Sequence, residues 1–234
     1  MEAIQRLCEI GQEQLMRLEY LQAARTLAQA EELALRHHDF DVLARLYMPL
    51  QEARRQRRQR CGEGIIRLDL IPKSAADPLS PEKIAEQFPH GQLLFAGWGT
   101  IQPVIELRRL QEDRGQYSET FLAAVYPIES ARVVAIVPTD EVALPPPNPM
   151  SIDRLLRLLP PHSVVLTEDD LPRPAYSEVM ALWERLHAPF LGAADLEHDP
   201  MRKIQAYRKT IRVDYACELA HQHLAETARR LRAP

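Results

Sequence analysis

The chain has 234 residues, with 29 Lys and Arg against 33 Asp and Glu, a formal net charge of −4 and 46% hydrophobic residues. These values are typical of one or two globular domains, and they exclude a disordered chain or a disulfide-stapled miniprotein. No apolar stretch approaches the roughly 18 residues of a membrane helix, and the charged N-terminus lacks a signal-peptide core. Three widely spaced cysteines, Cys8, Cys61 and Cys217, argue against a disulfide framework or a metal site. We therefore expect a cytoplasmic protein with no cofactor and no membrane contact.

The first 60 or so residues are expected to be helical, because apolar side chains recur at helical spacing and no strand pattern interrupts them. Gly11 falls inside the first helix, where it costs about 1 kcal/mol relative to Ala unless a second backbone packs closely against it. Ala23 and Ala30 lie at helical spacing in the segment that follows. Small residues in both segments predict a closely packed antiparallel helix pair.

This pattern is similar to the tetratricopeptide repeat, a helical hairpin with bulky and small residues at fixed positions. The residues that match it are Leu7, Ile10, Gly11, Ala23, Leu27 and Ala30. A shift of 33 residues brings Phe40, Leu43, Ala44 and Tyr47 into the pattern of a further first helix. Leu50 to Arg60 does not fit a second repeat helix, and we expect a solvated closing helix there.

The arginines of that segment, Arg54 to Arg60, also suit nucleic-acid phosphates, since guanidinium groups bind them bidentately. No aromatic residue is interleaved for base stacking, and the chain is acidic overall. We therefore expect a solvated face or a contact with acidic protein groups, and no nucleic-acid binding.

The central region changes to short apolar runs bounded by Gly, Pro or charged residues, as expected of buried strands. The expected strands are Ile65–Ile71, Gln92–Ala96, Thr120–Tyr126, Val133–Val137 and Ser163–Thr167. The expected helices run from Pro81 to about Phe88, from Ile101 to about Asp113, and from Ser151 to Leu159. This alternation predicts a small three-layer α/β domain with a largely parallel sheet. Thr120 to Val137 alternatively forms a hairpin, and the proline-rich stretch Leu144–Pro149 is expected to be a stiff loop.

Helices return at the C-terminus, from Ala175 to about His187 and from Met201 to Leu231, with a loop from Pro189 to Pro200 between them. Leu219, Ala220, Leu224 and Ala225 resemble a tetratricopeptide helix, so the resemblance extends to about residues 200–231. Asp214-Tyr215 stands where the family has Asp-Pro, which leaves open one continuous helix instead of a turn. We expect α/β plus all-α architecture, with a helical domain at 1–62, an α/β domain at 63–172 and a C-terminal helical segment at 173–234.

The resemblance implies partner binding at the inner face of the first helices, at Gln12, Leu15, Met16 and Arg45. Family members that clamp a C-terminal carboxylate use Lys and Asn there, whereas this chain has Cys8, Gln12, Asp41 and Arg45. Such clamping is therefore not expected. The leading hypothesis is a non-enzymatic interaction or scaffold protein whose partner is another protein, with a homo-oligomer left open.

The alternative is a small-molecule or nucleotide-binding α/β protein, an enzyme included, that uses Gly97, Gly99 and Thr100. These residues follow an expected strand and open an expected helix, where glycine N–H groups and the helix N-terminus favour phosphate. Asp140 and Asp169 would follow other strands of a parallel sheet and suit a hard cation. The full dinucleotide fingerprint and the usual hydrolase, redox and P-loop motifs are absent from the sequence.

Overall fold

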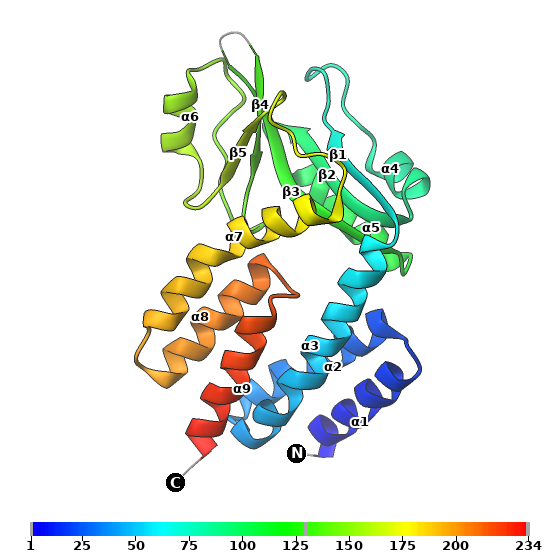
Figure 1. Ribbon diagram of the computed structural model, residues 1–234, viewed down its shortest axis with the longest axis vertical. Helices are drawn as coiled ribbons and strands as arrows, with labels where there is room; N and C mark the ends of the chain where they lie inside the picture. Colours follow the sequence, from blue (N-terminus) through cyan, green and yellow to red (C-terminus); the bar gives the residue numbers. More distant parts are fainter. Residues whose placement is uncertain (1, 129–130, 233–234) are drawn as a thin grey trace. The chain divides into compact units, whose positions relative to one another are not determined.

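The computed structural model describes residues 2–128 and 131–232 (Figure 1). The chain divides into two compact units, one made of Met1–Gln59 with His187–Pro234 and the other of Arg60–Leu186. The terminal helical segments thus belong to one unit, and the sheet unit is inserted between them in sequence. The domain boundaries expected near residues 62 and 172 stay a prediction, because compactness alone does not establish independent folding.

The helical unit contains α1 (Glu2–Met16), α2 (Tyr20–Arg36), α8 (Pro200–Val213) and α9 (Glu218–Arg232). It also contains the first part of α3 (Phe40–Gly62) and the last part of α7 (Tyr176–Leu196). One hydrophobic core joins all six helices and includes Ile4, Leu27, Tyr47, Ala194, Tyr207 and Leu224. The N-terminal helices pack against one another as helical hairpins, as the sequence predicts.

The close packing expected at Gly11 is present. A Cβ atom added at Gly11 would lie 2.6 Å from Cγ of Leu27 on α2. Glycine therefore permits a close approach between α1 and α2, whereas a larger residue would force the Leu27 side chain to shift.

Two helices contain an internal proline. Phe40–Tyr47 and Leu50–Arg60 are one helix, α3, with Pro49 inside it. The loop expected at Pro189–Pro200 is wrong over most of its length, because α7 contains Pro189 and continues to Leu196. Asp214 and Tyr215 lie in a turn between α8 and α9, so the continuous helix left open there does not form.

The sheet unit has five strands in sequence order: β1 (Ile65–Leu70), β2 (His90–Trp98), β3 (Tyr117–Pro127), β4 (Arg132–Ile136) and β5 (Val164–Thr167). β1, β2 and β3 run parallel, whereas β4 pairs antiparallel with both β3 and β5. The sheet is therefore mixed, and the hairpin alternative for Thr120–Val137 is confirmed.

Helices cover the two faces of this sheet. Leu93, Phe95 and Leu122 pack in one cluster with side chains of α4 (Pro81–Gln87), α5 (Gln102–Asp113) and α6 (Ile152–Leu158). Phe121 points to the opposite face, since side chains alternate along a strand, and stacks on Trp183 of α7 at 4.3 Å between ring centroids. Across the described ranges, no helix combines the length and apolar character that crossing a membrane requires.

Candidate functional site

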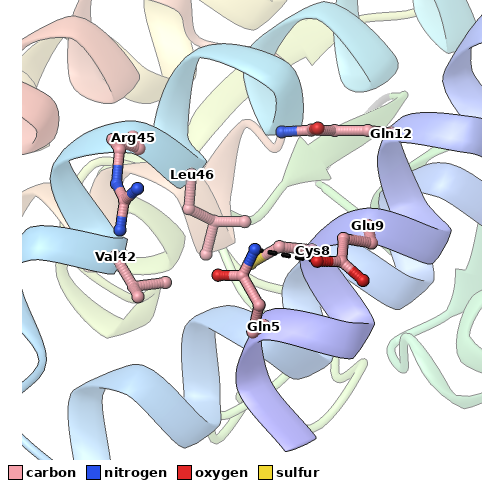
Figure 2. Close-up of a pocket in the computed structure, with 7 residues that line it drawn as sticks. All are labelled: Gln5, Cys8, Glu9, Gln12, Val42, Arg45 and Leu46. Atoms are coloured by element: carbon pink, nitrogen blue, oxygen red, sulfur yellow. Dashed lines mark hydrogen bonds between the residues drawn. The ribbon is translucent and has the colours of Figure 1, made fainter. Parts of the chain in front are cut away.

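A small hollow of about 80 Å³, open to solvent, lies between α1 and α3 in the helical unit. Its lining residues are Gln5, Cys8, Glu9, Gln12, Val42, Arg45 and Leu46. Figure 2 shows the α1 side chains facing those of α3 across this groove, which we call the α1–α3 groove. Gln12 and Arg45, two of the predicted partner-binding residues, lie on opposite walls of it.

The groove presents polar groups around a small apolar floor. Gln5 Nε2 donates to Glu9 Oε1 at 3.0 Å, while Val42 and Leu46 supply apolar contacts from α3. Burial raises the pKa of the Cys8 thiol, and the nearby Arg45 guanidinium opposes that rise. The thiol is therefore a neutral, weakly polar part of the wall at neutral pH.

Arg45 is oriented by a neighbour on its own helix. Its Nη2 lies 2.5 Å from Oδ2 of Asp41, and the other oxygen of Asp41 lies 2.8 Å from Nη1 of Arg232 on α9. The guanidinium is mostly exposed, so the ion pair is screened and leaves donors available at the groove.

The other two predicted partner-binding residues lie elsewhere. Leu15 is half-buried against the helical core. Met16 is 76% exposed, but it does not line the groove. Their roles in binding stay predictions.

The turn after β2 is filled by the chain itself. A Cβ atom at Gly97 would lie 2.3 Å from the carbonyl oxygen of Thr100, and one at Gly99 would lie 2.4 Å from Cβ of Pro147. Gly99 also has a φ of 64°, which favours glycine. Thr100 Oγ1 accepts from the backbone N–H of Gln102 at 3.2 Å. A tight turn covered by the proline-rich loop explains these residues without a phosphate.

The sheet topology treats the two acidic candidates differently. Asp140 follows β4, whose carboxyl end points opposite to those of β2 and β3. Asp169 follows β5, which is parallel to β3 but separated from β2 by two strands. In the described part of the chain, no three His, Cys, Asp or Glu residues gather as metal ligands. Ligand binding at these residues stays a prediction, and only Asp169 keeps the sheet edge that it was expected to share with the β2 turn.

The arginine-rich end of α3 lies against a buried polar network that the sequence analysis missed. Arg58 binds Asp214 at 2.8 Å, with only 5% and 1% of these side chains exposed. Arg54 Nη1 lies 2.9 Å from Nε2 of His221, and Arg54 is partly buried. The expectation of a solvated face is therefore wrong for these arginines, because their partners come from the C-terminal helices. Leu50, Ala53 and Cys61 follow the same buried face and were the available signal.

Comparison of the chain with family models, with curated proteins and with solved structures finds no match in any of the three.

Proposed function

We propose that this chain is a protein-interaction module that binds a segment of a partner protein in the α1–α3 groove, in the manner of a tetratricopeptide-like hairpin pair. The observation that carries the proposal is the open hollow between α1 and α3, with Gln12 and Arg45 on its walls. Two separate helices line it, and each contributes side chains able to contact a ligand. The proposed activity is recognition without chemical conversion.

The groove chemistry supports a peptide ligand. Gln5 and Gln12 are seven residues apart on α1, so their Cα atoms are about 10.5 Å apart along one face of the helix. Each amide has both donors and an acceptor, as a peptide backbone requires. Val42 and Leu46 offer apolar contact for a side chain, and Arg45 offers a cation at the rim.

A photo-crosslinking experiment tests where the partner binds. A photoreactive amino acid at Gln12 of the full chain should form a covalent adduct with a partner in native lysate, which mass spectrometry identifies. The same group at Arg36, exposed on α2 outside the groove, is the control and should give no such adduct.

Charge reversal tests whether the groove contributes affinity. Arg45→Glu should lower capture of the crosslinked partner by about tenfold or more, as expected for loss of an interface arginine. Arg36→Glu is the matched control and should leave capture unchanged. Undiminished capture by Arg45→Glu together with Met16→Ala would rule out this face of the helices as the binding site.

A further inference from the structure

The chain passes between its two units twice, and both passages lie inside helices. The first is at Gln59–Arg60 in α3, and the second is at Leu186–His187 in α7. Figure 1 shows α3 and α7 as continuous helices through these positions. A side chain of the helical unit stands beside each passage, namely Arg58 at the first and His187 at the second.

One carboxylate binds both of these side chains. Asp214, in the turn between α8 and α9, has Oδ1 2.8 Å from Nη2 of Arg58 and Oδ2 2.7 Å from Nδ1 of His187. The backbone N–H of Ala216 donates to Oδ1 at 3.1 Å, which holds the carboxylate on its own turn. Asp214 thus links α3 and α7 to each other through a third element.

The surroundings make this carboxylate hard to replace. The guanidinium carbons of Arg57 and Arg58 lie 4.7 and 5.1 Å from the centroid of the Tyr215 ring. Burial raises the pKa of Asp214, but Arg58 and His187 outweigh that effect and hold the pKa below its usual value. Loss of the negative charge would leave the buried Arg58 and the partly buried His187 without their shared partner, which is strongly unfavourable.

We propose that Asp214 is a conformational lock, because its one carboxylate fixes the α3 passage and the α7 passage at the same time. While the carboxylate is charged, the end of α3 and the middle of α7 are held to the α8–α9 turn. When its charge is lost, both helices are released together.

Amide hydrogen exchange on the full-length chain tests the lock. Asp214→Asn keeps the shape of the side chain but removes its charge, and it should accelerate exchange about tenfold or more at residues 57–62 and 184–190. The protected amides of α2 and of the β2–β3 pair should change little. Asp195→Asn is the control, because Asp195, near the end of α7, is another carboxylate of the same unit and binds Tyr207 and His223 instead. It should leave α3 exchange unchanged.

Two further variants test the Arg58–Asp214 and His187–Asp214 contacts one at a time. They also provide the test if Asp214→Asn does not fold. Arg58→Met should accelerate exchange chiefly at 57–62, and His187→Ala chiefly at 184–190. Cys217 lies three residues after Asp214 and is only 4% exposed. Its alkylation should be faster in all three variants than in the Asp195→Asn control. The proposal is overturned if Asp214→Asn leaves the α3 passage unchanged, or if every variant accelerates exchange equally throughout the helical unit.

Discussion

His221 is a buried imidazole that the folded chain holds in its neutral form. Arg54 can only donate, so Nε2 of His221 accepts its hydrogen bond, and Nδ1–H donates to the carbonyl oxygen of Cys217 at 2.8 Å. These two contacts require the neutral Nδ1–H tautomer. Burial, reinforced by the charge of Arg54, lowers the pKa of His221 from 6.5 to about 3.

The low pKa of His221 predicts acid sensitivity. Between pH 6.5 and about 3, only the unfolded chain binds this proton, so its contribution to stability is full above pH 6.5 and is lost as pH falls. The loss should approach about 1.4 kcal/mol per pH unit within that window. Urea unfolding at several pH values should therefore show a shallower acid dependence in His221→Gln than in the natural chain. His223→Gln, on the same helix, is the control, and an unchanged slope in His221→Gln would contradict the prediction.

Residue-scale contacts of this kind were hard to predict from the sequence because their partners are far apart in the chain. Arg54 and His221 are separated by 167 positions. A local reading therefore assigned the arginines of α3 to solvent. Gln12 and Arg45 were placed on the inner face through the resemblance to the tetratricopeptide repeat, and both line the α1–α3 groove.

Two helical glycines make opposite predictions at the scale of single elements. At Gly11 an added Cβ would lie 2.6 Å from Leu27 Cγ. At Gly192 in α7, the added Cβ would meet no atom of the described residues within 4 Å beyond its neighbours and its own helix backbone. Gly192→Ala should stabilise the chain by about 0.5–1 kcal/mol through helix propensity. Gly11→Ala should instead destabilise it by about 1–3 kcal/mol, because overpacking outweighs the propensity gain.

Thermal unfolding of the two alanine variants provides the measurement, since each serves as the control for the other. Combining Gly11→Ala with Leu27→Val tests the cause, because a smaller side chain on α2 should restore part of the lost stability relative to Leu27→Val alone. An increase in stability from Gly11→Ala would show that α1 and α2 are not in close contact.

The strands were predictable as elements, because each is a short apolar run ended by Gly, Pro or charge, and all five were anticipated. Their directions were less accessible, since the sequence supported both a parallel arrangement and a hairpin at Thr120–Val137. The predicted end of α7 near His187 was wrong for a different reason. Proline removes one helical hydrogen bond at Pro189, but the side chains on both sides of it, Leu186 and Ala194, are buried and favour continuing the helix.

At the scale of the whole molecule, the sequence suggested separate helical segments at the N-terminus and the C-terminus. In the fold, the helices of both segments share one hydrophobic core. Leu27 of α2 and Leu224 of α9 belong to the same buried cluster. The spacing of residues within one helix cannot reveal that two helices share a core when the whole sheet unit separates them in the sequence. The stability of α1 and α2 should therefore depend on the C-terminal helices.

Truncating a core side chain in α9 tests this dependence. Leu224 is fully buried, so Leu224→Ala should cost about 2–5 kcal/mol and should accelerate amide exchange in α2 as well as in α8 and α9. Leu107→Ala, at an equally buried site in α5, is the control and should act mainly on the amides of β2 and β3. Faster exchange confined to α8 and α9 in Leu224→Ala would mean that the N-terminal helices are stable without them. A shared response would instead establish that the α1–α3 groove depends on the C-terminal helices, so that variants far from the groove in sequence would weaken partner binding through the common core.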